Sequence, residues 1–328
     1  MLASNFFVSS ALSQTLEAVK QRGHLICAAS QPMSGFAQKS NEGYWSGFDV
    51  DFCRAISVAI FSDPNKVEFK PYSGLARFAP LQTGDVDVFV RNAPWNLTRD
   101  TSYQVRYVGT SFFDGQAFLT KKQLGIVSSY ELENVRVCVM GGGDDQRNLV
   151  EFFFKNQTNY EEVIYEERGD LAIAYQAGLC DTVTAPASWL YSILRSLPDS
   201  SSHQILPERI SKQPLGPVVR NGDDEWFDII QWVLFALLNA EELGINSLSV
   251  TSLEDVKTPA IRRFLGFESD FGEPLGLEKD WMQKMIEEVG NYEEIYERSF
   301  GPQTGANLPR GINALWTQGG LLFAPPIR

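Results

Sequence analysis

Two stretches of this sequence, Gln82-Thr83-Gly84-Asp85-Val86-Asp87 and Gln176-Ala177-Gly178-Leu179-Cys180-Asp181, share the pattern Gln-x-Gly-x-x-Asp. Each lies just ahead of or within a short apolar segment, at 86–90 and 182–184, that we interpret as the third strand of its half of the chain. A single short match of this kind could arise by chance. Here, however, the motif occupies the same place in the order of expected strands and helices in both halves of the chain. The repeat therefore predicts two similar α/β lobes, each a βαβ array around a parallel sheet.

The elements around the repeated motif follow from hydrophobic spacing. A helix is expected where apolar residues recur every three or four positions, as at Phe52, Ile56 and Ile60. Pro214 and Pro217 favour an extended segment over 210–219, because proline cannot continue a helix. The expected strands are 24–29, 67–71, 86–90, 135–140, 162–165 and 182–184, and the expected helices are 49–61, 77–82, 148–155, 171–177, 223–243, 280–289 and 293–300.

This order of elements predicts where the chain passes between the lobes. We expect lobe 1 to contain residues 15–115 and 213–328, and lobe 2 to contain residues 116–212. Crossings near 113–119 and 209–217 would form the hinge. Because an open α/β sheet binds ligands beyond the carboxyl ends of its strands, two such lobes facing each other define a cleft.

Composition excludes several classes of protein. The 328 residues suit about two domains, and 28 basic against 41 acidic residues give a formal charge of −13. That balance works against binding nucleic acid or an anionic membrane surface. The first fourteen residues, MLASNFFVSSALSQ, resemble the end of a signal peptide with a small-x-small cleavage site, and a disordered N-terminus is the alternative.

The four cysteines, Cys27, Cys53, Cys138 and Cys180, form no Cys-x-x-Cys motif. Two lie early and two lie in the middle of the chain, which suits one disulfide within each lobe of an exported protein. The alternative is four small buried hydrophobic residues. With only two histidines in the sequence and no clustered ligands, we expect no structural metal site.

A family resemblance rests on motifs spread from residue 15 to residue 328. They are TLEAVKQRG (15–23), GFDVDFCRA (47–55), RN (91–92), ISKQPLGP (210–217), GDD (222–224), GINALW (311–316), GGL (319–321) and APPIR (324–328). Together they resemble the periplasmic substrate-binding protein of general L-amino-acid ABC importers, within the family 3 extracellular solute-binding proteins. The resemblance implies a two-lobed, type II periplasmic-binding-protein fold in a monomeric protein without a cofactor or catalysis. Its partners would be a small ligand and ABC permease subunits with a cytoplasmic ATPase.

The resemblance also implies ligand-binding residues in lobe 1. Arg99 matches the arginine that holds the ligand α-carboxylate in relatives, and a guanidinium fork suits that group. Arg91 and Asn92 match positions that line the pocket, although an interlobe salt bridge is an open alternative for Arg91. Phe36, or Met33 beside it, would form an aromatic or apolar wall, and Trp95 would cover the ligand. For both Phe36 and Trp95, packing in the core is an equally open alternative.

Two positions in lobe 2 depart from the family pattern. Where relatives have Gly-Thr-Thr, this chain has Gly142-Gly143-Asp144 followed by Asp145, so a carboxylate lies near the expected ligand carboxylate. Asp144 as a helix cap is the alternative. Pro186 stands where relatives have the aspartate that receives the ligand ammonium, and proline offers neither a charge nor an N–H. Either Asp144 or Asp145 replaces that acid, or the ligand is no longer a standard amino acid.

Two other functions share this scaffold. A signalling receptor of the same fold would dock onto a sensor instead of a permease. A dehydratase-like enzyme would need a placed acid or base, and His24 in an expected strand and His203 in a polar loop form no catalytic set with a nucleophile. We therefore expect an extracytoplasmic receptor that binds an amino acid or related small carboxylate between its lobes.

Overall fold

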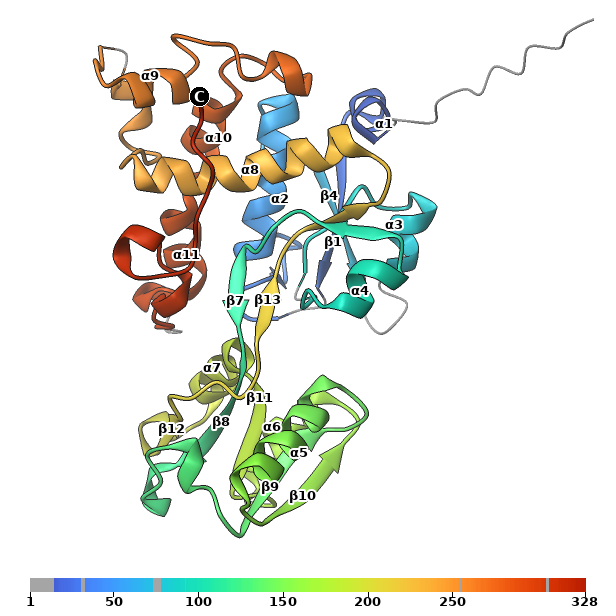
Figure 1. Ribbon diagram of the computed structural model, residues 1–328, viewed down its shortest axis with the longest axis vertical. Helices are drawn as coiled ribbons and strands as arrows, with labels where there is room; N and C mark the ends of the chain where they lie inside the picture. Colours follow the sequence, from blue (N-terminus) through green and yellow to red (C-terminus); the bar gives the residue numbers. More distant parts are fainter. Residues whose placement is uncertain (1–14, 31–32, 73–77, 92, 254, 305–306) are drawn as a thin grey trace, which may run out of the picture.

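A computed structural model describes residues 15–30, 33–72, 78–91, 93–253, 255–304 and 307–328. In it the chain forms two lobes joined by two extended segments that pair with each other (Figure 1). Each lobe has its own five-stranded sheet, so the predicted two-lobed α/β fold is confirmed. The predicted signal segment lies in residues 1–14, outside the described residues. No helix in the described ranges is long and apolar enough to span a bilayer.

The sheet of lobe 1 has the strand order β4-β1-β5-β14-β6. Its strands are β1 (Leu25–Ser30), β4 (Val67–Tyr72), β5 (Val88–Phe89), β6 (Val105–Tyr107) and β14 (Val218–Arg220). β1 runs parallel to β4 and β5, whereas β14 runs antiparallel to β5 and β6. All six residues of β1 are buried, as expected for a central strand with both faces covered.

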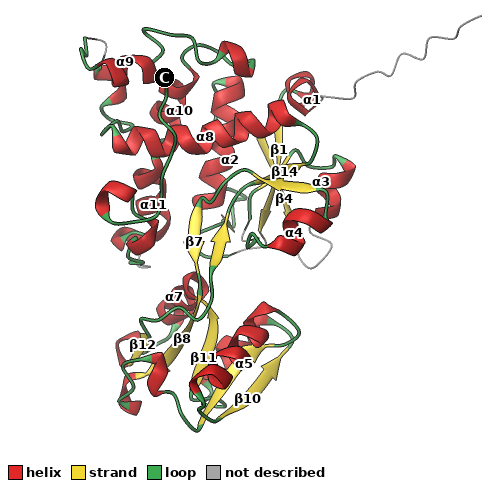
Figure 2. Cartoon of the chain, viewed as in Figure 1, coloured by secondary structure: helices red, strands yellow, loops and turns green. Residues whose placement is uncertain are grey.

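The helices of lobe 1, drawn in red in Figure 2, lie beside this sheet or pack against the helices that do. They are α1 (Thr15–Arg22), α2 (Phe48–Phe61), α3 (Ala79–Thr83), α4 (Leu97–Ser102), α8 (Asp224–Glu242), α9 (Pro259–Phe264), α10 (Trp281–Val289) and α11 (Tyr292–Phe300), with a small hairpin of β2 (Gln38–Lys39) and β3 (Trp45–Ser46). The indole of Trp226 on α8 donates to the backbone carbonyl of Asp87 at 2.9 Å, which fastens the longest helix to the sheet.

Lobe 2 repeats the arrangement with the strand order β10-β9-β11-β8-β12. Its elements are β8 (Gln116–Lys121), β9 (Val135–Met140), α5 (Asp144–Asn156), β10 (Tyr160–Tyr165), α6 (Arg168–Gln176), β11 (Thr182–Pro186), α7 (Ala187–Ser196) and β12 (His203–Ile205). β9 is parallel to β10 and β11, and β8 is antiparallel to β11 and β12. The core between these elements is apolar, and it is separate from the main core of lobe 1.

The repeated Gln-x-Gly-x-x-Asp motif has the same structural role in both lobes. The backbone N–H of Asp87 donates to Ile26, the second residue of β1, and its carboxylate accepts from the Ile26 N–H. Asp181 makes the same two contacts with Arg136, the second residue of β9. The motif therefore ties the start of the third strand to the first strand of each lobe, which explains why it occurs twice.

The hinge consists of β7 (Phe112–Asp114) paired antiparallel with β13 (Gln213–Leu215). Both strands lie within or beside the predicted crossings at 113–119 and 209–217. Gly115 follows β7 where the two crossings lie close together, since a Cβ there would lie 2.6 Å from the carbonyl oxygen of Ser211. A side chain at Gly115 would push the crossings apart.

The C-terminal tail contacts both the helices of lobe 1 and the hinge. The Asn313 side-chain amide accepts from the Phe113 N–H at 2.6 Å and donates to the Phe113 carbonyl at 3.0 Å. Arg310 binds Glu241 on α8 through two contacts, at 2.6 and 3.0 Å. Residues near the end of the chain thus support the strand that connects the lobes.

Each lobe contains one disulfide, as predicted. Cys27 of β1 is bonded to Cys53 of α2, and Cys138 of β9 is bonded to Cys180. All four cysteines are buried, and none of them is free, so the alternative of four unpaired buried cysteines is wrong. The bonds fasten an inner strand of each sheet, β1 or β9, to a neighbouring segment.

Replacing both Cys138 and Cys180 by Ala is expected to lower the free energy of unfolding by about 2–5 kcal/mol. The reason is that the bond closes a loop with a sequence separation of 42, which restricts the unfolded chain. Urea unfolding followed by circular dichroism measures the loss. The Cys27→Ala/Cys53→Ala variant is the matched control, with a shorter separation of 26 and a slightly smaller expected loss. Unchanged midpoints in both variants would contradict the prediction.

Candidate functional site

A cavity of about 630 Å³ lies between the two lobes. Elements of both lobes contribute to it, and the lining includes the carboxyl ends of β9 and β11 and the start of α5. The residues that line it are Phe78, Pro94, Asn96, Thr98, Arg99, Tyr103, Met140, Gly141, Gly142, Gly143, Asp144, Asp145, Arg147, Arg168, Pro186, Gln213 and Leu215. Its position is the one expected for ligands of open α/β sheets.

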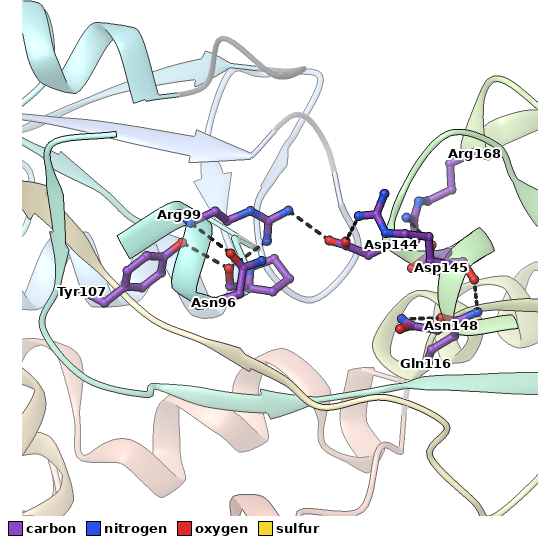
Figure 3. Close-up of polar contacts among 10 residues, drawn as sticks. Asn96, Arg99, Tyr107, Gln116, Asp144, Asp145, Asn148 and Arg168 are labelled. Atoms are coloured by element: carbon purple, nitrogen blue, oxygen red, sulfur yellow. Dashed lines mark hydrogen bonds and ion pairs between the residues drawn. The ribbon is translucent and has the colours of Figure 1, made fainter. Parts of the chain in front are cut away.

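Arg99 is the charged residue that lobe 1 contributes to this lining. It lies on the short helix α4, whose N-cap residue Asn96 accepts the Arg99 backbone N–H at 2.9 Å. The Arg99 Nη1 atom donates to the carbonyl of Pro94 at 2.7 Å, and the Tyr107 hydroxyl donates to the same carbonyl at 3.2 Å. These contacts orient the guanidinium toward lobe 2 (Figure 3).

Asp144 meets that guanidinium from the other side of the cavity. It is the first residue of α5, and its Oδ2 atom lies 3.3 Å from Arg99 Nη2. Its other oxygen pairs with Arg147 on the same helix. Asp144 therefore lies between two arginines, one from each lobe, and forms an ion pair across the cleft (Figure 3).

Asp145, the next residue, is buried and also lines the cavity. It pairs with Arg168 at 2.9 Å, and the Arg168 guanidinium lies 5.5 Å from the centre of the Trp189 ring. Burial raises the pKa of the Asp145 carboxyl above its ordinary value, while the charge of Arg168 and its hydrogen bond oppose that rise. Asp145 is thus a buried carboxyl that is already paired with Arg168.

A buried amide network supports the start of α5. Gln116 is fully buried, and its Nε2 atom donates to the Asp145 carbonyl at 2.8 Å and to Thr184 Oγ1 at 3.0 Å. Its Oε1 atom accepts from Asn148 at 3.0 Å. The network joins α5 to β8 and β11, so the N-terminus of the helix is held rigidly beside the cavity.

Pro186 also lines the cavity, at the end of β11 and the N-cap of α7. The acid nearest to it in the hinge, Asp114, accepts from the Ser188 hydroxyl at 2.5 Å and from the Gly115 N–H at 2.8 Å. Burial raises the pKa of the Asp114 carboxyl, and those hydrogen bonds oppose the rise. Asp114 is not among the residues that line the cavity.

Five of the predicted ligand-binding residues line the cavity, namely Arg99, Gly143, Asp144, Asp145 and Pro186. Phe36 does not, because its ring is 1% exposed and packs against Phe48, Phe112 and Phe300 in the core. The core reading of Phe36 is the one the structure favours.

Trp95 and Arg91 also lie outside the lining. Trp95 stacks on Tyr107 with ring centres 5.3 Å apart. Arg91 donates to the backbone carbonyl of Tyr72 within lobe 1, and its charge opposes the burial that raises the pKa of Asp49 to about 8. Asn92 lies outside the described residues, and Met33 pairs with Ala37 in an isolated bridge.

Sequence reasoning missed most of the polar residues on the lobe 2 side and the hinge. Arg147, Arg168 and Gln213 line the cavity. No motif marks the two arginines, and Gln213 lies in the family motif ISKQPLGP without being predicted as a site residue. The one available signal was for Arg147, three positions after Asp144, a spacing that places two side chains together on a helix. Neither histidine is in the lining, and within the described ranges no group of three His, Cys, Asp or Glu side chains is placed to hold a metal.

Comparisons with known proteins agree with this architecture. Residues 25–245 match the family model of bacterial extracellular solute-binding proteins, family 3. The general L-amino acid-binding periplasmic protein AapJ of Rhizobium johnstonii is 43% identical over 98% of this chain and 94% of its own length. The glutamate/glutamine/aspartate/asparagine-binding protein BztA of Rhodobacter capsulatus is 42% identical over the full length of both.

A solved structure has nearly the same fold over almost the whole chain. It is an ABC transporter periplasmic binding protein from Brucella ovis with glutathione bound, and it is 42% identical. The TM-score is 0.90, and the match covers 96% of this chain and 100% of that one.

Proposed function

This chain belongs to the bacterial extracellular solute-binding proteins of family 3, and from that premise we propose that it is the receptor of an amino-acid ABC importer. It binds an amino acid or related small carboxylate in the cavity between its lobes. Lobe closure then presents the loaded receptor to the permease. The receptor works outside the cytoplasmic membrane as a monomer and performs no chemistry on its ligand.

The observation that carries this proposal is the position of Arg99. Its guanidinium is held by the Pro94 carbonyl and points across the cavity to the N-terminus of α5. A guanidinium from one lobe and a helix N-terminus from the other are two groups that favour the same anion. A ligand carboxylate between them contacts both lobes.

Contacts in both lobes also explain how binding drives closure. A ligand shifts a conformational equilibrium only by the difference between its affinities for the two states. A carboxylate that reaches Arg99 and α5 together binds the closed state more tightly than the open one. The paired strands β7 and β13 provide the hinge. We place one lobe boundary just after β7, at 115/116, and the other just before β13, at 212/213.

The charges of the cavity favour an acidic ligand. Among the described residues, its lining contains one more positive than negative side chain, with Arg99, Arg147 and Arg168 against Asp144 and Asp145. A ligand with a net charge of about −1 complements that excess. Glutamate, in the name of BztA, and glutathione, in the Brucella ovis structure, both have an excess of carboxylates over ammonium groups.

A thermal-shift screen of the purified protein tests the proposed function. The panel contains the twenty L-amino acids, glutathione, polyamines, betaines and small organic acids. A true ligand at 100 times its dissociation constant is expected to add about 2.7 kcal/mol of stability. We expect the largest shift from an acidic amino acid or glutathione. Silence from every carboxylate, or a response to polyamines alone, would contradict the proposal.

A further inference from the structure

The ion pair between Arg99 and Asp144 occupies the place where a ligand carboxylate would bind. Arg99 Nη2 lies 3.3 Å from Asp144 Oδ2, and Arg99 Nη1 is engaged by the Pro94 carbonyl. A ligand carboxylate that binds Arg99 at Nη2 therefore displaces Asp144. The displaced carboxylate would then face the ligand at close range, where two anions repel each other.

A zwitterionic ligand resolves this conflict. Its carboxylate takes the place of Asp144 on Arg99, and its ammonium takes the place of Arg99 on Asp144. One ion pair is exchanged for two, and neither charged side chain is left without a partner. A carboxylate that lacks the ammonium makes the first contact only and leaves Asp144 beside another anion.

We propose, on the basis of the receptor function above, that Asp144 receives the ligand ammonium and thereby selects amino compounds over plain carboxylates. Pro186 lines the same cavity without a charge, and of the two acids in the described lining Asp144 is the exposed one. Asp144 thus performs from the start of α5 the role that Pro186 cannot perform from the end of β11.

Asp144 suits this role better than its neighbour Asp145. The Asp144 side chain is 40% exposed to the cleft, so a ligand can reach it. The Asp145 side chain is 6% exposed, and it is bound to Arg168, which is itself in contact with Trp189. Moving Asp145 to a ligand would leave Arg168 partly buried without its partner, which is costly.

The test compares two probes that differ only in the ammonium group, L-glutamate and glutarate. Isothermal titration calorimetry measures both affinities for the unaltered protein and for the Asp144→Asn variant. We expect the unaltered protein to prefer L-glutamate, and the variant to lose that preference by about tenfold or more, with tighter binding of glutarate. The asparagine keeps the size of the aspartate, and the N-cap of α5 is Gly143 and not Asp144, so the melting temperature should change little.

The matched control is Glu151→Gln, the same change of charge on the exposed face of the same helix. This variant shows the general effect of removing one negative charge. Its preference for L-glutamate over glutarate should equal that of the unaltered protein. An equal preference in Asp144→Asn would overturn the assignment of Asp144. If the unaltered protein binds neither probe, the proposed ligand class itself fails, which is a different outcome from an unchanged preference.

A second readout needs no ligand. Spin labels on the two lobes report the distribution of distances between them in the free receptor. The Arg99–Asp144 pair holds the lobes together, so Asp144→Asn is expected to broaden that distribution toward longer distances, as does high salt in the unaltered protein. A distribution that neither the substitution nor salt alters would overturn the interlobe pair.

Discussion

Replacing Arg99 by Ala is expected to weaken binding of any carboxylate ligand by about 30-fold to several thousand-fold, a loss of about 2–5 kcal/mol. The guanidinium is the cation that lobe 1 offers to the cavity, and its side chain is only 16% exposed. Removing it leaves the ligand carboxylate partly buried without its partner. Calorimetric titration with the ligand identified by thermal shift measures the loss.

The Arg99→Lys variant separates charge from geometry. Lysine keeps the positive charge but has no planar fork for a carboxylate. The affinity of Arg99→Lys for the ligand should therefore fall between those of the unaltered protein and Arg99→Ala. The fold should remain intact in both variants, because the Asn96 cap contacts the backbone and not the side chain of Arg99. Unchanged affinity in Arg99→Ala would remove Arg99 from the site.

Replacing Arg310 by Ala is expected to lower the free energy of unfolding by about 3–5 kcal/mol. Its partner Glu241 has a side chain only 2% exposed, so the substitution leaves a buried carboxylate without a counter-charge. Arg310 also packs against the rings of Tyr292 and Tyr296, and that packing is lost as well. Urea unfolding measures the effect.

The loss should depend on pH in a defined direction. Burial already raises the pKa of Glu241 above 4.5, and Arg310 opposes that rise, so the pKa rises further in Arg310→Ala. A carboxyl with a raised pKa in the folded state stabilises the protein below its ordinary pKa and loses that contribution as pH rises. The variant should therefore be less destabilised at about pH 5 than at about pH 8.

The double variant Glu241→Gln/Arg310→Met provides the control. It removes both charges, so no buried ion remains without a partner, and its stability should be closer to that of the unaltered protein. A loss equal to that of Arg310→Ala would show that packing, and not the isolated charge, is responsible.

The fold could be predicted from the sequence because its signals are local. The Gln-x-Gly-x-x-Asp motif marks the third strand of each lobe, and the contacts of Asp87 and Asp181 give the physical reason. The predicted strand at 86–90 shortens to β5 at Val88–Phe89, since the ends of an element depend on its neighbours.

The site could be predicted only in part, because side-chain direction depends on tertiary packing. Phe36 is predicted to form a wall beside the ligand, but its ring turns into an aromatic cluster with residues as distant as Phe300. Arg168 is held at the cavity by its ion pair with Asp145 and its contact with the Trp189 ring. No local sequence pattern predicts these contacts. Arg99 and Asp144 were each predicted near the ligand, whereas their contact with each other depends on the position of the lobes.

The contact between Asn313 and Phe113 has a practical consequence for sensor design. The hinge strand β7 has β13 along one edge and the Asn313 amide along the other, so we expect a movement of the hinge to change the surroundings of the C-terminal tail. Ile312, beside Asn313, is 48% exposed and lies outside the ligand cavity. A fluorophore attached at position 312 would sense the movement of the hinge without touching the ligand, which makes the tail a natural reporter site.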